Sequence, residues 1–522
     1  MHSIYTADEA GTMDKHTIEE IGIPSLVLME RAGMAITDEI EKYIHDIHGS
    51  NETLKKEKIL CIAGCGNNGG DVLTAARQLQ ERGYSPDVLL IEENTDKLSE
   101  DLRKQISFAE KIGINFIRET DMTSYEVIVD GIFGNGLSRN VEGKYKEIIE
   151  AVNGSHAFVI SADVPSGLNA SNGKICGACV KADVTVTFGR ERLGSCLAPG
   201  TIYSGRVVVS NIGFDMSFEK RMDIKNFLLD DEDLKRIPRR ASNSNKGTFG
   251  RVLIIAGSED MGGAAVLSAQ AALRSGAGLV KVYTHVSNRV PLISSVPEAI
   301  VLTYNELDKN SISADLEREM RMVDSIVIGP GLSANETAEF ITEYVITHAI
   351  GKLIVDADAI NILSKRKDLP EFLSKAKCER LIMTPHIKEM SRLSKESVEN
   401  ILEDRISVAV RMANSLGADI ILKDSTTLVT DGNITAINNR PNSGMSTPGS
   451  GDVLAGMLAG IAAQGCSGID IALAGVYLHS SCGNAAKNRL GEYSMLAGDI
   501  VNGLADEYAE DVESEANDIT PD

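Results

Sequence analysis

The stretch Gly444-Met445-Ser446-Thr447-Pro448-Gly449-Ser450-Gly451-Asp452 runs directly into the apolar segment VLAGMLAGIAA at 453–463. We predict a glycine-rich turn that opens a buried helix. Backbone amides exposed by the glycines, together with the positive end of the helix, form a site for anionic oxygens. Asp452 stands where a base would lie beside a phosphate. The stretch is therefore typical of a phosphoryl-transfer centre.

Length and composition indicate a two-domain globular protein, because 522 residues are too many for one core. The net charge of −23 argues against nucleic acid and membrane surfaces as partners. We find neither an apolar run of about 18 residues nor a signal-peptide pattern, so we expect no membrane span. The eight cysteines include one CxxC pair, Cys176 and Cys179, whose use in metal or redox chemistry is the minor alternative. Without a disulfide pattern they suit a reducing compartment, and we expect a cytoplasmic protein.

Short apolar runs alternate with amphipathic stretches along the whole chain. This pattern predicts the α/β class, with two domains that are each a mostly parallel sheet covered by helices on both faces. We place the domains at 1–220 and 226–510 and an acidic, frayed tail at 511–522. The predicted strands are 59–63, 88–91, 127–129, 158–161, 184–188, 206–210, 252–255, 279–283, 325–328, 353–355, 381–384 and 420–422.

The loop GCGNNGGD at 64–71 follows the first predicted strand of the first half and satisfies G-x-G-x-x-G. Such a match by itself is weak evidence for a nucleotide site. The alternative is a tight strand-to-helix turn with Asp71 as an N-terminal cap. The additional Asn67 and Asn68 favour a polar site at this loop.

Two further strand ends in the first half carry carboxylates, Asp130 and Asp163, each followed by glycines. Loops beyond the carboxyl ends of parallel strands converge on one crevice. Asn68, Asp130 and Ser166 could therefore give oxygens to one cation, and oxygen-only ligation suits a hard ion rather than zinc. Each aspartate taken alone could equally be a helix cap.

In the second half, polar side chains again follow predicted strands. Asp356 and Asp358 follow one strand, His386 another and Lys423 a third. Taken singly, His386 is more often a core or capping residue, and Lys423 a surface charge at a strand end. Their shared position after strands favours one cleft.

With these motifs, the first half resembles the NAD(P)HX epimerase family over about residues 1–215. The matching motifs are GCGNNGGD, DGIFGNGL, SADVPSGLNASNG and TVTFGRERLGSCLAPG, together with Asp14 and the segment at 22–33. The resemblance implies a Rossmann-like fold, exchange of the two epimers of hydrated NAD(P)H at carbon 6 of the nicotinamide ring, and potassium bound by Asn68, Asp130 and Ser166. It implies Asp163 as a catalytic residue. The substrate contacts it implies are Asn67, Asn68, Gly69, Gly70, Asp71, Gly134, Asn135, Gly136, Leu137, Ser138, Arg139, Asn140 and Asp163.

The second half resembles ADP- or ATP-dependent NAD(P)HX dehydratase of the ribokinase-like superfamily over about residues 226–505. The motifs are NKGTFGRVLIIAGS, GGAAVLSAQAALRSGAGLVKV, IGPGL, VDADAIN, TPHIKEMSRL and GMSTPGSGDVLAGMLAGIAAQG, then VYLHSSCGNAA and GEYSMLAGDI. The resemblance implies Asp452 as the base, with Ala264, Gly331, His386, Ile387, Lys388, Glu389, Met390, Ser391, Arg392 and Asp452 facing the hydrate. It implies a nucleotide contact for Lys423, Asp424, Ser425, Thr426, Thr427, Asn442, Ser443, Gly444, Met445, Ser446, Thr447, Pro448, Gly449, Ser450 and Gly451.

Together the two resemblances imply a bifunctional enzyme that repairs NADHX and NADPHX. Its second domain would use ADP in preference to ATP, with magnesium, to phosphorylate and expel the hydroxyl of the S epimer. We expect a homo-oligomer. Val72, Asp424 and the pair Ile387-Lys388 depart from the family pattern. The rival hypotheses are a small-molecule kinase with an accessory domain and a first half that senses nucleotides without catalysis.

Overall fold

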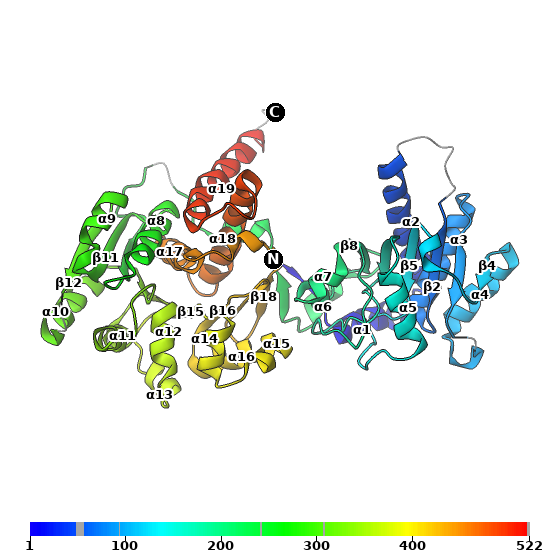
Figure 1. Ribbon diagram of the computed structural model, residues 1–522, viewed down its shortest axis with the longest axis horizontal. Coiled ribbons are helices and arrows are strands. Elements are labelled where there is room, and N and C mark those ends of the chain that lie inside the picture. Colours follow the sequence, from blue (N-terminus) through cyan, green and yellow to red (C-terminus); the bar gives the residue numbers. More distant parts are fainter. Residues whose placement is uncertain (49–56, 93, 241–242, 306–307, 519–522) are drawn as a thin grey trace. The chain divides into compact units, whose positions relative to one another are not determined.

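The computed structural model describes residues 1–48, 57–92, 94–240, 243–305 and 308–518, with side chains described as far as 508. The chain divides into two compact units (Figure 1). One unit is Ser3–Asn226, and the other combines Met1–His2 with Phe227–Asp522. Each unit contains a mostly parallel sheet with helices on its faces, which confirms the predicted fold class.

The described part of Ser3–Asn226 holds one seven-stranded sheet in the order β4-β3-β2-β5-β6-β7-β8, in which neighbouring strands pair parallel. The strands are β2 (Ile59–Ala63), β3 (Asp87–Leu90), β4 (Asn115–Ile117), β5 (Val127–Gly131), β6 (Phe158–Ala162), β7 (Val184–Phe188) and β8 (Arg206–Ser210). The α-helices are α1 (Ala7–Lys15), α2 (Ser25–His48), α3 (Asn67–Glu81), α4 (Glu100–Ile112), α5 (Lys144–Asn153), α6 (Leu193–Cys196) and α7 (Gly200–Ser204).

The strand order of this sheet reverses between β2 and β5, and ligands bind at such switch points in open α/β sheets. Ala63 at the end of β2 is level with Gly131 at the end of β5. The loops that follow touch each other, because a Cβ at Gly64 would lie 1.9 Å from the carbonyl oxygen of Ile132. The glycine-rich loop and the Asp130 loop are therefore forced into one crevice.

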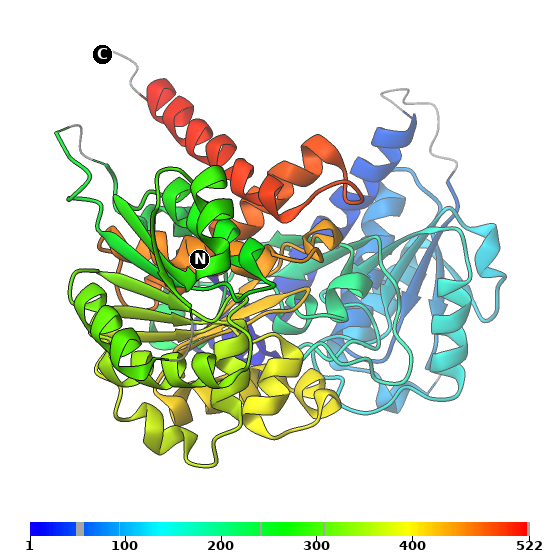
Figure 2. The same ribbon diagram turned by 60° about the vertical axis from the view of Figure 1, so that its left-hand side comes forward.

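The sheet of the second unit has eleven strands among the described residues, in the order β1-β9-β18-β17-β16-β15-β14-β13-β10-β11-β12. Its strands are β1 (His2–Ser3), β9 (Asn226–Leu228), β10 (Arg251–Ile255), β11 (Leu279–His285), β12 (Ile300–Tyr304), β13 (Ser325–Ile328), β14 (Lys352–Val355), β15 (Arg380–Met383), β16 (Asp419–Leu422), β17 (Thr427–Thr430) and β18 (Thr435–Asn438). The order reverses between β10 and β13. Figure 2 shows this sheet with helices on both sides.

The α-helices of the second unit are α8 (Gly262–Arg274), α9 (Arg289–Ser295), α10 (Lys309–Met320), α11 (Glu336–His348), α12 (Ala357–Ser364), α13 (Leu369–Leu373), α14 (Ile387–Ser394), α15 (Val398–Glu403), α16 (Arg405–Leu416), α17 (Ser450–Ala463), α18 (Asp470–Leu490) and α19 (Ala497–Asp518). Every residue of α17 from Val453 to Ala463 is buried. This explains why the helix is apolar on all sides, as helices inside a large core are.

Small residues allow α17 to lie directly against α8. A Cβ at Gly456 would meet the carbonyl oxygen of Ser268 at 2.3 Å, and a Cβ at Gly460 would meet the hydroxyl of Ser275 at 2.2 Å. The Ser268 hydroxyl also donates to the backbone oxygen of Asp452 at 3.0 Å. This packing sets where the predicted phosphate turn lies.

Two parts of the sequence-based prediction are corrected. The strands that the prediction missed include β4, β12, β17 and β18, of which β17 and β18 pair antiparallel across the turn at Asp431 and Gly432. An Asp-Gly pair between short strands is a hairpin signal, so the sequence did contain this information. The expected tail at 511–522 is helical as far as Asp518, as part of α19, since Ala and Glu favour helix despite the acidic composition.

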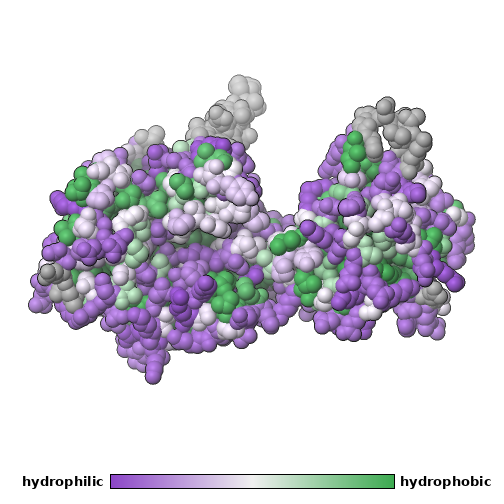
Figure 3. Space-filling model, in the orientation of Figure 1, coloured by the Kyte–Doolittle hydropathy of each residue, from purple (hydrophilic) through white to green (hydrophobic). Residues whose placement is uncertain are grey.

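Among the described residues no helix is long and apolar enough to span a membrane. Figure 3 shows hydrophilic and hydrophobic residues interspersed over the visible face of both units. The eight cysteines form no disulfide with one another, and Cys176 and Cys179 are both buried.

We predict that Gly456→Ala destabilises the second unit by about 1–3 kcal/mol, because the added methyl must displace the α8 backbone. Urea unfolding should show a lower midpoint. Gly498→Ala is the matched control, since a Cβ there meets nothing within 4 Å and alanine favours helix. Equal midpoints for the two variants would contradict the packing argument.

Candidate active sites

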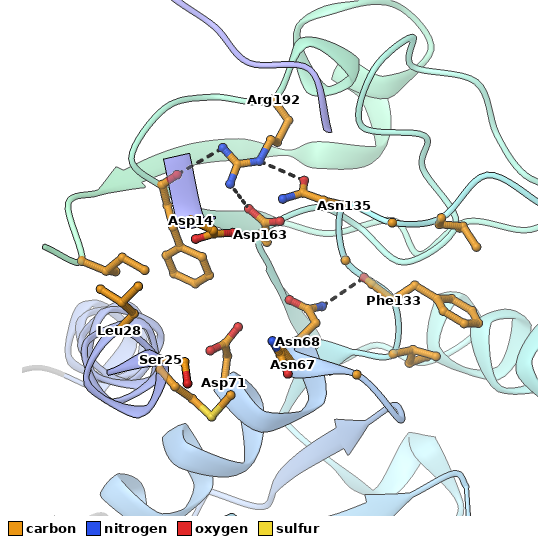
Figure 4. A pocket seen from close by; sticks show the side chains of 18 of the residues that line it. Asp14, Ser25, Leu28, Asn67, Asn68, Asp71, Phe133, Asn135, Asp163 and Arg192 are labelled. Atoms are coloured by element: carbon orange, nitrogen blue, oxygen red, sulfur yellow. Dashed lines mark hydrogen bonds and ion pairs between the residues drawn. The ribbon is translucent and has the colours of Figure 1, made fainter. Parts of the chain in front are cut away.

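A cavity of about 650 Å³ lies beyond the carboxyl ends of β2, β5 and β6 in the first unit (Figure 4). It is lined by ten of the residues predicted to contact the hydrate: Asn67, Asn68, Asp71, Gly134, Asn135, Gly136, Leu137, Ser138, Arg139 and Asp163. Three predicted contacts, Gly69, Gly70 and Asn140, are not among the lining residues. A Cβ at Gly69 would meet the Gly64 backbone and one at Gly70 the side chain of Met29. These two glycines therefore serve close packing.

Asp163 is held by Arg192, a residue that the sequence reasoning did not assign. Arg192 Nη2 lies 2.7 Å from Asp163 Oδ1, and the Thr187 hydroxyl donates to the same oxygen at 3.2 Å. Asp163 has a left-handed backbone with φ of 64°, which turns its side chain from the end of β6 towards the cavity. Arg192 is itself fixed, because its Nε donates to Asn135 Oδ1 at 2.9 Å. The signal for Arg192 was its place in the quoted TFGRERLG motif.

Two more carboxyl groups line the cavity, Asp14 and Asp71. Burial raises the pKa of Asp14 to about 6, with Arg192 opposing and Asp163 adding to the rise. Burial, Asp163 and Asp14 together raise the pKa of Asp71 well above its usual range. Asp71 is not the helix cap of the alternative hypothesis, because α3 begins four residues earlier with Gly66 as its N-cap.

The predicted potassium ligands form a cluster of oxygens beside the cavity. Asp130 is buried and accepts hydrogen bonds from the hydroxyls of Ser161 (2.8 Å) and Ser166 (2.5 Å). The Ser166 hydroxyl also lies 3.2 Å from the carbonyl oxygen of Phe133, to which the Asn68 amide donates at 3.0 Å. The structure thus brings the three residues together, because Asn68 and Ser166 share the Phe133 carbonyl and Ser166 also binds Asp130. Such an all-oxygen set fits a hard cation.

The predicted phosphate turn of the second unit leads to an open helix end. Gly449, with φ of 94°, is the N-cap of α17, and the described residues give the helix no side-chain cap. The first-turn amides of a helix have no intrahelical acceptors, so those of Gly451 and Asp452 can bind an anion. His479 Nε2 donates to the backbone oxygen of Ser450 at 3.0 Å and fixes this turn, and sequence reasoning gave His479 no role.

Asp452 lies next to a buried ion pair. Lys423 Nζ is 2.7 Å from Asp356 Oδ1, and the Thr384 hydroxyl donates to the same oxygen at 2.5 Å. A Cβ at Gly451 would lie 3.3 Å from Lys423 Nζ and 3.8 Å from Asp356 Oδ2, so the pair abuts the first turn of α17. Burial raises the pKa of Asp452 to about 7, with Asp356 adding to the rise and Lys423 opposing it. Lys423 is thus not the surface charge of the alternative interpretation.

His386 is a capping residue, as its alternative interpretation held. Its Nδ1 accepts hydrogen bonds from the amides of Lys388 (3.1 Å) and Glu389 (3.3 Å) at the start of α14. The His386 amide in turn donates to Glu389 Oε2 at 2.8 Å. The backbone of His386 pairs with that of Lys423. Burial raises the pKa of Glu389 to about 7, while Lys423 opposes the rise. The α14 terminus and the ion pair therefore share one location.

Other predicted dehydratase residues are placed in different ways. Ala264 and Gly331 adjoin, since a Cβ at Gly331 would lie 2.8 Å from that of Ala264. Met390 is buried in packing, and the Ser391 hydroxyl donates to the Glu396 carbonyl at 2.6 Å, so these two side chains are engaged elsewhere.

The departures from the family pattern find structural partners. Asp424 Oδ2 lies 3.4 Å from Arg405 Nε, so a neighbouring cation offsets the extra carboxylate. Val72 is buried, and a Cβ at Gly131 would lie 2.4 Å from it, which shows that the valine packs against the end of β5.

Comparison with known proteins assigns a family to each unit. Residues 25–194 match the family model described as YjeF-related protein N-terminus, and residues 252–505 match the model described as NAD(P)H-hydrate dehydratase. The bifunctional NAD(P)H-hydrate repair enzyme of Moorella thermoacetica is 33% identical over 96% of each chain. That of Thermofilum pendens is 31% identical over 95% of this chain and 94% of its own.

A solved structure also matches the second unit. The ADP/ATP-dependent NAD(P)H-hydrate dehydratase of Bacillus subtilis, co-crystallised with ATP and Mg²⁺, is 27% identical over 55% of this chain and 98% of its own, with a TM-score of 0.48. The full-length relatives carry the assignment: the chain belongs to the bifunctional NAD(P)H-hydrate repair enzymes, with an epimerase and a nucleotide-dependent dehydratase in one polypeptide.

Proposed function

We propose that the cavity of the first unit exchanges the R and S epimers of NADHX and NADPHX, and that the second unit dehydrates the S epimer with ADP at the N-terminus of α17. The observation that carries the second assignment is the uncapped first turn of α17, with Asp452 beside the Asp356–Lys423 pair. Preference for ADP over ATP follows the resemblance alone and stays a prediction. The cytoplasmic location, which the cysteine pattern suggests, and the homo-oligomeric state also stay predictions.

In the proposed dehydration, Asp452 takes the proton from the hydroxyl of the hydrate, and that oxygen attacks the terminal phosphate of the nucleotide. The first-turn amides of Gly451 and Asp452 stabilise the charge that develops on the transferred group, whereas the Ser450 amide already donates to the Thr447 carbonyl oxygen at 3.3 Å. The phosphate ester then leaves as the ring nitrogen donates its electron pair, which restores NAD(P)H. Lys423 and the nearby hydroxyls hold the nucleotide phosphates.

Magnesium would reach this site with the nucleotide. No group of three or more histidine, cysteine, aspartate or glutamate side chains within the described ranges is placed to hold a metal ion. Magnesium commonly binds through substrate phosphates with one or two carboxylates, and such a carboxylate is available here in Asp356 or Asp358. When bound, the ion neutralises phosphate charge.

A coupled assay tests the function. We expect the full chain, mixed epimers of NADHX, magnesium and ADP to restore the absorbance of NADH, and ATP to do so more slowly. Asp452→Asn should abolish recovery while ADP binding, followed by calorimetry, stays nearly unchanged. Retention of more than a tenth of the wild-type rate would show that Asp452 is not the base. A stable phosphorylated product without NADH would favour the rival kinase.

The pH dependence of dehydration should report Asp452. A base must be ionised, so kcat/KM should rise as the pH increases through about 7 and level off above it. Asp356→Asn removes a carboxylate that raises the pKa of Asp452 and leaves the opposing charge of Lys423, so the acid limb should move to lower pH. The wild-type and Asp356→Asn chains are assayed with the same nucleotide, so ionisation of the nucleotide contributes equally to both pH profiles. An acid limb of kcat/KM at the same pH in both chains would contradict this electrostatic account.

Potassium binding at Asn68, Asp130 and Ser166 is tested by stability as well as rate. A bound ion stabilises the folded state, so KCl should raise the unfolding midpoint of the first unit above that in choline chloride of equal ionic strength. Epimer exchange should show the same preference. Ser166→Ala should abolish both differences, and no difference between the salts for the wild-type chain would refute the potassium site.

A further inference from the structure

Three carboxyl groups line the first cavity, Asp14, Asp71 and Asp163, but among the described residues an ion pair reaches only one of them. Asp163 has Arg192 at 2.7 Å and the Thr187 hydroxyl at 3.2 Å. Among the described residues, no hydrogen bond or ion pair reaches Asp14 or Asp71. Charge is therefore balanced at Asp163 and unbalanced at the other two, and burial with the neighbouring carboxylates raises the pKa of Asp71, which favours its protonated form.

Asp71 and Asp163 approach the cavity from different elements. Asp71 extends from the first turns of α3, while Asp163 and Arg192 enter from the end of β6 and the segment after β7 (Figure 4). Figure 4 shows an open space between the two carboxyls. The two groups interact electrostatically, because Asp163 is, next to burial, the largest cause of the raised pKa of Asp71. Apolar side chains, among them Leu28 and Phe214, complete the wall.

Inversion at a carbon that bears a hydroxyl beside a ring nitrogen needs help on both faces. On one face an acid must protonate the departing hydroxyl, and on the opposite face a base must accept a proton from the entering water. Two carboxyl groups, one protonated and one ionised, supply both functions. This requirement applies only if the first unit has the epimerase function proposed above.

We propose that Asp71 and Asp163 are an acid–base pair that inverts carbon 6 of the hydrate by exchanging its hydroxyl with water. Asp71 gives its proton to the hydroxyl oxygen, and the C6–O bond breaks with its electron pair leaving in a water molecule. The ring nitrogen shares its lone pair with carbon 6. Water then adds to the opposite face, the nitrogen recovers its lone pair, and Asp163 takes the proton that this water releases.

After one inversion the two carboxyls have exchanged protonation states. The same pair then acts in the opposite direction on the other epimer, so both directions depend on both groups. Arg192 is a positioning residue, which holds Asp163 Oδ1 at 2.7 Å and keeps the carboxylate aimed at the cavity. Asp14 also faces the pair and contributes negative charge that favours the proton on Asp71.

Labelled water tests the proposal on the wild-type chain. In ¹⁸O-labelled water, each inversion should introduce one ¹⁸O atom at carbon 6 of the product epimer, measured by mass spectrometry after chiral separation. Inversion without incorporation would overturn the proposal but leave the epimerase function standing. Failure of the wild-type chain to exceed the spontaneous exchange rate would instead overturn the epimerase function.

Variants test the two residues. Asp71→Asn and Asp163→Asn should each slow exchange in both directions by about 100-fold or more, the usual contribution of one acid or base. Glu110→Gln, at an exposed carboxylate on α4, is the matched control and should exchange at the wild-type rate. Dehydration of pure S epimer reports only on the second unit, so a circular dichroism spectrum and an unfolding midpoint equal to those of the wild-type chain must show that the first unit of each variant is folded. An Asp71→Asn chain that keeps more than a tenth of the exchange rate would overturn the pairing.

Discussion

In both units one buried carboxylate is paired with one cation, and the neighbouring carboxyls have no such partner. Arg192 holds Asp163 in the first unit, and Lys423 holds Asp356 in the second. Burial penalises every further negative charge, so the unpaired groups Asp71 and Asp452 have raised pKa values. The proton transfers proposed for Asp71 and Asp452 rest on this imbalance between buried carboxyl groups and cations.

The two sites share a second constraint, which is topological. In each sheet the strand order reverses once in the parallel part, between β2 and β5 or between β10 and β13. Crossover connections diverge at such a point, so the loops after the two strands have space for a ligand. The glycine-rich loop and the Asp130 loop meet there in the first unit. In the second, the loops after β10 and β13 meet through the amides of Gly257 and Ser258, which donate to the carbonyl oxygens of Pro330 and Gly331 at 2.9 and 2.7 Å.

Close helix packing connects fold stability with function in the second unit. Gly456 and Gly460 bring α17 against α8, and Ser268 on α8 binds the backbone of Asp452. A larger side chain at either glycine would move the helix end that carries Asp452. The apolar, small-residue composition of α17 therefore serves the site as well as the core.

Much of this protein was determined by the sequence alone. Apolar strand patterns, the glycine turns and the ordered motifs predicted two α/β units, and the strand-end residues Asn68, Asp130 and Ser166 do lie together. The antiparallel β17–β18 pair and the helical end of the chain were missed, because short Thr-rich strands and acidic helices give weak periodic signals. Arg192 lies within one of the family motifs, but no residue near it in the sequence indicates that its partner is Asp163. Pairing and protonation were decided by tertiary structure alone, because both depend on distances between segments far apart in the chain and on how completely folding removes water from them.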